Sequence, residues 1–231
     1  MRPYGTVAED LEVDFTSARA VVVTELLARC LEREAEELWD LPISKRSLLL
    51  VAVSEQTAPP IEVHLSCACG EASELTLTSA ELAEFAAERA KDPRVGELRL
   101  RVPTGRDQLR WTALAAENDE TLKERVLLDL VVDAPAAIDP AMLPLIDKAL
   151  GEIDPLVELR VDSTCSACGA PVSIGVDLEA IAISRMRKIQ RDFVEDVHHL
   201  ARAYHWSEAD IARMPVWRRS EYLALLGKAR A

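Results

Sequence analysis

The stretch IEVHLSCACG (residues 61–70) ends in two cysteines and a glycine, and the stretch VELRVDSTCSACG (residues 157–169) ends in a similar way. In both, apolar and polar residues alternate ahead of the first cysteine, which is the pattern of a half-buried β-strand. Alternation resumes after each glycine, at residues 75–77 and 172–176. We therefore expect two hairpins, each built as strand, cysteine turn and return strand.

Helical patterns surround both hairpins, so the chain has a weak internal repeat of helices, hairpin and helix. Apolar spacing and capping residues predict helices over these ranges: 17–39, 44–56, 79–90, 106–116, 121–133, 141–153, 177–204, 207–214 and 216–229. A short strand is expected at 98–102. The fold class is α+β and mostly helical, with the hairpins forming a zinc-ribbon-like element and with a helical C-terminal tail. The expected parts are an N-terminal repeat unit (1–92), a second repeat unit (93–178) and a C-terminal helical segment (179–231).

Four of the five cysteines form two close pairs, Cys67 with Cys69 and Cys165 with Cys168. A cysteine turn between two strands directs its backbone N–H groups at the sulfurs and supplies two metal ligands. Two such turns complete the four-thiolate tetrahedron that zinc prefers. We predict one structural zinc that joins the hairpins. The first pair is one residue shorter than the usual Cys-x-x-Cys spacing, so we expect strain in that turn.

Other interpretations of these residues stay open. His64 lies three residues before Cys67 and could replace a cysteine ligand, although a strand favours a position beside the site. Four unliganded thiols, or a redox pair of Cys165 and Cys168, are the alternatives to a metal. Cys30 lies on an apolar helical stripe and is expected to be a small buried hydrophobe. Because four thiolates leave no open coordination position, the zinc would hold structure and would not catalyse.

The charge balance is acidic, with 40 acidic and 27 basic residues in 231 and a net charge of −13. Residues 185–231 carry a net +4, which leaves −17 for residues 1–184. An acidic body counts against nucleic-acid binding. No apolar run approaches the roughly 18–20 residues that span a bilayer, and no signal peptide is recognisable. We expect a cytoplasmic protein with no membrane contact, no catalytic motif and no small-molecule substrate.

Aromatic residues are scarce in this chain but gather near its C-terminus, beside two adjacent arginines. Aromatic and arginine side chains are enriched in protein interfaces. We therefore predict a partner-binding surface made of Tyr204, Trp206, Trp217, Arg218, Arg219 and Tyr222. The alternative is that some of these rings close a local core.

The C-terminal segment His198-x-Leu200-Ala201-x-x-Tyr204-His205-Trp206-Ser207-Glu208-x-x-Ile211, with Met214-Pro215, Arg218-Arg219 and Tyr222-Leu223 after it, is the most specific pattern in the chain. It resembles the closing motif of a baseplate protein family of contractile phage tails and related contractile injection systems, which includes baseplate hub proteins. Similar upstream pieces extend the resemblance over most of the chain: LLARC (26–30), Leu41-Pro42 with Arg46, RVPTGRD (101–107) and both cysteine turns.

The resemblance implies a non-enzymatic structural or assembly role at a baseplate, near the central spike and hub. It implies other baseplate, hub or spike subunits as partners, and incorporation into a phage tail-like particle. An alternative from another class is a zinc-ribbon regulator that binds nucleic acid through its C-terminal helices. A small redox enzyme using Cys165 and Cys168 is a third alternative.

Overall fold

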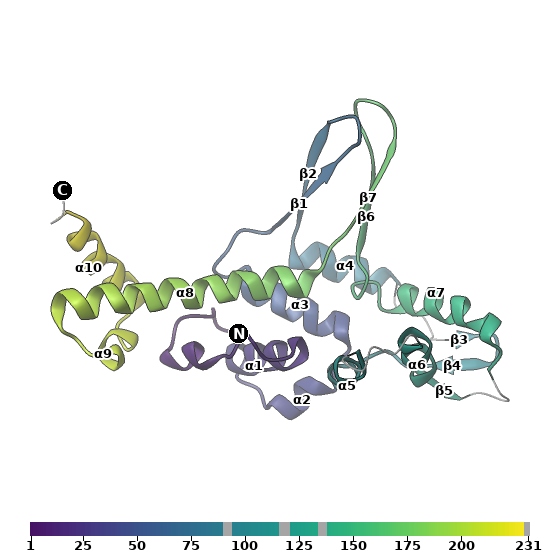
Figure 1. Ribbon diagram of the computed structural model, residues 1–231, viewed down its shortest axis with the longest axis horizontal. Helices are drawn as coiled ribbons and strands as arrows, with labels where there is room; N and C mark the ends of the chain where they lie inside the picture. Colours follow the sequence, from purple (N-terminus) through teal and green to yellow (C-terminus); the bar gives the residue numbers. More distant parts are fainter. Residues whose placement is uncertain (90–93, 116–120, 134–137, 229–231) are drawn as a thin grey trace.

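The structure is a computed structural model that describes residues 1–89, 94–115, 121–133 and 138–228. It is mostly helical, with small antiparallel sheets. The 27-residue helix α8 (Leu178–Tyr204) runs along the body (Figure 1). Two hairpins stand out from the body as one projection, which we call the finger. Residues 191–228 extend beyond one end of the body, and we call this segment the arm.

The N-terminal part packs its helices against the first half of α8. Its elements are η1 (Ala8–Glu12), α1 (Arg19–Leu31), α2 (Ala35–Trp39) and α3 (Ile43–Ser54). Leu26, Leu50 and Met186 are fully buried in their shared core. The predicted continuous helix over 17–39 is wrong, because Glu32 takes a left-handed conformation (φ 54°) and ends α1.

The finger consists of two antiparallel hairpins. The first pairs β1 (Ile61–Ser66) with β2 (Ala72–Leu77), and the second pairs β6 (Arg160–Thr164) with β7 (Pro171–Gly175). Every second residue of β1 is buried, as the alternation predicts, in a core shared with α3, α4 (Ser79–Arg89) and the second hairpin. The second hairpin begins at Arg160 and not at the predicted 157, because Val157 N–H closes a turn onto Asp154.

The opposite end of the body holds a small third core around Leu98, Leu127 and Ile146. It is built from β3 (Arg94–Val95), β4 (Leu98–Leu100), α5 (Gly105–Ala115), α6 (Leu122–Asp129), β5 (Val131–Asp133), η2 (Pro140–Met142) and α7 (Leu143–Ile153). The predicted helix over 121–133 is too long. Its last residues pair with β4, with Val131 opposite Leu100.

The predicted C-terminal segment 179–231 is not separate from the body. Leu178, Ala182 and Met186 of α8 are buried in the cores of the finger base and the N-terminal helices. Beyond them the chain continues as the arm, which includes α9 (Glu208–Ala212) and α10 (Val216–Lys228). A boundary at residue 179 therefore cuts through packed structure.

Candidate metal centre

The four paired cysteines meet where the turns of the two hairpins come together. The Sγ atoms of Cys67 and Cys168 are 3.6 Å apart, as are those of Cys69 and Cys165. All four sulfurs lie within 4.8 Å of one another, and none is in a disulfide. A tetrahedron with metal–sulfur bonds of about 2.3 Å separates its sulfurs by about 3.8 Å. The predicted ligand set is therefore brought together in a geometry able to hold one metal ion.

Both turns have the same design although their spacers differ by one residue. In the first, Cys67 N–H donates to the Glu71 carbonyl (2.8 Å) and Gly70 N–H donates to the Cys67 carbonyl (3.0 Å). In the second, Cys165 N–H donates to Ala170 (2.9 Å) and Gly169 N–H donates to Cys165 (3.0 Å). The shorter spacer is accommodated by a hydrogen bond that closes over three residues instead of four. The strain predicted for the first turn does not displace its sulfurs from the cluster.

The backbone of the second turn favours a thiolate. The N–H groups of Cys168 and Ala167 lower the pKa of Cys165 to about 7. The N–H of Cys69 also lowers the pKa of Cys67, but hydrogen bonds with the other three thiols outweigh it and raise that pKa to about 12. Four thiolates this close repel one another, so a bound cation would promote the loss of the remaining protons.

The other two residues considered for this site lie outside the cluster. His64 is 63% exposed on the outer face of β1, where its Nδ1 lies 3.1 Å from the Glu74 carboxylate across the hairpin. It is not one of the clustered ligands. Cys30 is fully buried in the N-terminal core, which confirms it as a small buried hydrophobe.

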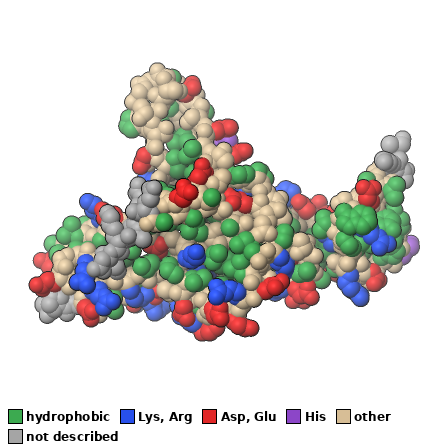
Figure 2. Space-filling model, turned by 180° about the vertical axis from the view of Figure 1, so that it is seen from behind, with side chains coloured by type: hydrophobic (Ala, Val, Ile, Leu, Met, Phe, Trp, Pro, Cys, Tyr) green, Lys and Arg blue, Asp and Glu red, His purple; other side chains and the backbone are tan. Residues whose placement is uncertain are grey.

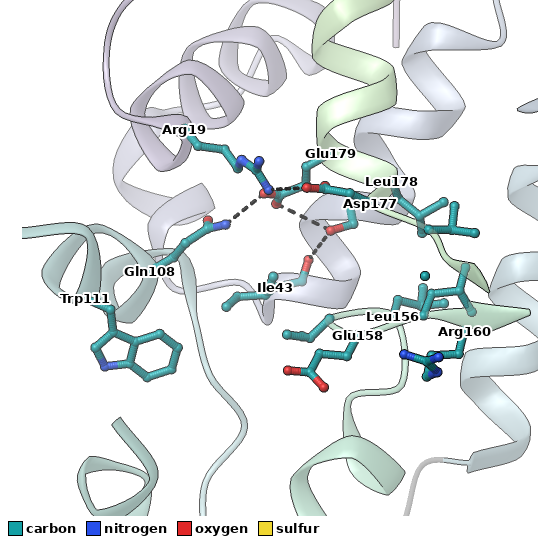
Figure 3. Close-up of a pocket in the computed structure, with 15 residues that line it drawn as sticks. Arg19, Ile43, Gln108, Trp111, Leu156, Glu158, Arg160, Asp177, Leu178 and Glu179 are labelled. Carbon is teal, nitrogen blue, oxygen red and sulfur yellow. Dashed lines mark hydrogen bonds and ion pairs between the residues drawn. The ribbon is translucent and has the colours of Figure 1, made fainter. Parts of the chain in front are cut away.

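A groove that the sequence did not reveal lies between α5 and the start of α8 (Figure 3). It has a volume of about 500 Å³. The Glu179 carboxylate accepts a hydrogen bond from Gln108 Nε2 (2.7 Å) at its inner wall, and Arg19 pairs with Asp177 (2.7 Å) at its rim. Burial raises the pKa of Glu179. Its walls come from residues 19 to 179, so no local motif could have indicated it.

The arm divides the predicted partner-binding residues into two groups. The rings of Tyr204 and Trp206 stack at 4.6 Å, and Tyr222 contacts both edge-on. Arg219 is only 4% exposed, and its guanidinium lies 4.3 Å from the centre of the Phe193 ring. These four residues pack α10 onto α8, so the prediction of an exposed docking contact is wrong for Arg219. Trp217 faces outward and is 69% exposed, and Arg218 is also exposed, with its guanidinium 5.8 Å from the centre of the Tyr222 ring.

Of the net +4 of residues 185–231, three charges come before the arm, and the fourth, Arg230, lies outside the described residues. Arg185 donates to the carbonyls of Pro59 and Pro60, and Arg187 donates to the carbonyl of Phe15, so both bind the body. Residues 191–228 contain six basic and six acidic residues. The arm is therefore balanced in charge.

Comparisons with protein-family models, with curated proteins and with solved structures find no match to this chain. In the part of the chain that the structure describes, no helix has the length and apolar character needed to cross a bilayer. The site belongs to the class of possible metal sites made of four cysteines, here from two hairpins that are far apart in the sequence.

Proposed function

We propose that this chain is a non-enzymatic structural or assembly component of a contractile tail or injection-system baseplate, and that a structural zinc closes its finger. The observation that supports the zinc is the convergence of four sulfurs within 4.8 Å from turns that 95 residues separate. The baseplate role is supported by the sequence resemblance and by an arm that presents exposed apolar side chains.

The ligand set favours zinc and a structural use of it. Tetrahedral sites made only of thiolates select zinc or iron. Four thiolates occupy every coordination position of a tetrahedral ion, so no position remains for a substrate or water. Binding energy at such a site stabilises the fold, because the ligands come together only in the folded chain. Iron in the same site would absorb visible light, whereas zinc would not.

The docking surface in this proposal is the outer face of the arm. Val216, Trp217 and Leu225 of α10 are each about half exposed or more, and Arg218 lies beside them. Figure 2 shows hydrophobic side chains gathered on the arm, at the end of the molecule away from the finger. Tyr204, Trp206, Tyr222 and Arg219 hold this face in place from beneath. The proposed partners are other baseplate, hub or spike subunits.

The nucleic-acid alternative has less support. The chain carries a net −13, and the arm that would enter a groove is balanced in charge. Affinity for DNA or RNA depends on neutralising phosphates with a surplus of lysine and arginine, and it falls steeply with salt. A gel shift that appears at low salt and weakens as salt rises would favour this alternative.

The docking proposal is tested by assembly. We expect the double variant Trp217→Ser with Arg218→Glu to fold with full metal content but to co-purify poorly with the other subunits of its particle, because the apolar and charged contacts are lost. Arg202→Glu is the matched control, since it reverses another exposed charge on the arm. Equal incorporation of wild type and double variant would contradict the docking surface.

A further inference from the structure

We propose that, without bound metal, the four cysteines are oxidised to two specific disulfides that cross between the hairpins, Cys67 with Cys168 and Cys69 with Cys165. The finger would then have a second, covalently closed state. This inference uses the same residues as the proposed zinc site, but it depends on the sulfur positions and not on the identity of a metal.

The pairing follows from the contacts between thiols. Each proposed pair joins one sulfur from each hairpin at 3.6 Å, within hydrogen-bond distance for sulfur. A disulfide has an S–S length of about 2.0 Å, so each pair needs to close by about 1.6 Å. Rotation of cysteine side chains at the ends of two short turns provides such a movement.

The two cysteines of each pair differ in solvent exposure, so we expect them to react with an oxidant in a fixed order. Cys168 and Cys69 are exposed, whereas Cys67 is half-buried and Cys165 is buried. Susceptibility to oxidants follows thiolate character and accessibility. Each pair therefore combines one sulfur that meets the oxidant with a less exposed neighbour that completes the reaction.

With hydrogen peroxide as the oxidant, the chemistry balances for each pair. The exposed thiolate attacks the O–O bond, becomes a sulfenic acid and releases hydroxide, which takes up a proton to give water. The neighbouring thiol then attacks that sulfur, the S–S bond forms as the S–O bond breaks, and the departing hydroxide takes the proton of this thiol and leaves as a second water. Two thiols are oxidised by two electrons, and one peroxide is reduced to two waters. The complete cluster consumes two peroxides.

Both bonds preserve the connection between the two halves of the finger. A bond within one turn, such as Cys165 to Cys168, would occupy ligands and leave the two cysteine turns unconnected. Disulfide bonds between the hairpins connect the same two turns that a coordinated metal ion would connect. The finger would therefore stay closed after its metal is lost under oxidising conditions.

Peptide mapping of the full chain tests the pairing. The protein is treated with a chelator and hydrogen peroxide, free thiols are alkylated, and trypsin digestion is done without reductant. Cys67 and Cys69 lie in the tryptic peptide 47–89, and Cys165 and Cys168 lie in 161–185. We expect these peptides to be joined, with a loss of four hydrogens. Separate peptides that have each lost two hydrogens, or reduced peptides only, would overturn the proposal.

Two variants resolve which sulfurs are joined. Cys69→Ser with Cys165→Ser retains the proposed pair Cys67 and Cys168. Cys67→Ser with Cys165→Ser is the matched control, because it retains Cys69 and Cys168, which are both exposed but not paired at 3.6 Å. We expect the first variant to form its disulfide at least tenfold faster, and equal rates would refute the pairing. Zinc stoichiometry of the wild-type chain is measured separately, so failure here leaves the metal proposal untouched.

Discussion

At the scale of single residues, Arg46 shows how a buried cation can organise several helices. Its side chain is fully buried, and its guanidinium donates to the carbonyls of Leu38 (2.8 Å) and Ala20 (2.9 Å) and to Thr24 Oγ1 (2.9 Å). Burial lowers the pKa of Arg46 to about 10. Gly105 lies against it so closely that a Cβ there would be 2.3 Å from Nη1. The RVPTGRD motif thus has a steric reason for its glycine.

We predict that Gly105→Ala lowers the free energy of unfolding by about 1–3 kcal/mol, because the added methyl group overpacks a rigid buried contact. Gly151→Ala is the matched control in α7, where an added Cβ meets nothing within 4 Å. That variant should be stabilised by up to about 1 kcal/mol, since alanine is the better helix former. Urea denaturation measures both, and equal effects would contradict the close contact.

Asp154 gives a prediction about pH. Its side chain is 4% exposed, and burial raises its pKa above the ordinary 3.8 despite hydrogen bonds from Ser44. A raised folded-state pKa means that the native state binds the proton more tightly than the unfolded state. Wild type therefore loses this contribution to stability as the pH rises from about 4 through the folded-state pKa.

We expect Asp154→Asn to remove this dependence, since the amide does not ionise. The stability of the variant relative to wild type should rise with pH across that window and become constant above it. Urea midpoints of both proteins measured between pH 4 and pH 8 provide the test. A difference that stays flat, or that falls with pH, would show that Asp154 is not a protonated buried acid at low pH.

Local spacing was enough to predict several helix caps, but not the start of α3, which begins at Ile43 and is not capped by Ser44. Thr78 and Glu81 exchange hydrogen bonds at the start of α4, Thr104 donates two hydrogen bonds to the Asp107 carboxylate at the start of α5, and Ser207 caps α9 by accepting from Asp210 N–H. Buried polar residues such as Arg46 and Glu179 could not be predicted. Their partners come from segments that are distant in sequence, and helical periodicity alone assigns charged residues to solvated faces.

At the scale of elements, the two cysteine turns were predictable because their signal is local: alternating strands, two cysteines and a glycine. The element ends that were missed depend on tertiary structure. Nothing in the local pattern marks Glu32 as the left-handed residue that ends α1, since glycine usually occupies such positions. Residues 131–133 leave the helical pattern because β4 provides a pairing partner.

The glycines of the turns allow an element-scale prediction. Gly169 has φ +71°, and an added Cβ there meets nothing within 4 Å, so its requirement is conformational and not steric. We expect Gly169→Ala to lower the free energy of unfolding by about 1–2 kcal/mol, because alanine is strained in the left-handed region. That loss should also weaken metal binding by about tenfold.

Gly175→Ala is the control in the same hairpin, because Gly175 has no positive φ and also has open space around it. Thermal unfolding and a competition titration with a metal chelator measure the two effects. If both variants bind metal equally well, the turn glycine does not shape the site.

At the scale of the whole molecule, α8 joins the body to the arm, and Arg219 of α10 packs against α8. Its guanidinium packs on Phe193 and donates to the Met214 carbonyl at 3.2 Å. We predict that Arg219→Ala reduces the hydrogen-exchange protection of α10 at least tenfold, because a largely buried contact is lost. Trp217→Ala should leave protection unchanged, since Trp217 of the same helix is 69% exposed. Equal hydrogen-exchange protection in the two variants would show that Arg219 does not hold α10 against α8.

The arrangement of the parts in space was beyond sequence reasoning. The net charge of each segment predicted a basic tail, but Arg185 and Arg187 bind backbone carbonyls of the body, and the exposed arm is balanced. The aromatic residues near the C-terminus predicted an interface, but Tyr204, Trp206 and Tyr222 pack on one another within the arm. Composition identifies which side chains are available, whereas only the fold decides which of them face outward.

We propose that one metal ion joins the two hairpins of the finger. The most direct test of this proposal is the zinc content of protein purified without added metal, measured by elemental analysis for wild type, Cys168→Ser and Cys30→Ala. We predict one zinc per chain in wild type and in Cys30→Ala, because Cys30 lies in a separate core, and well under half an equivalent in Cys168→Ser. Wild-type protein with little zinc, or a Cys168→Ser variant that retains a full equivalent, would show that these four cysteines do not hold a structural zinc.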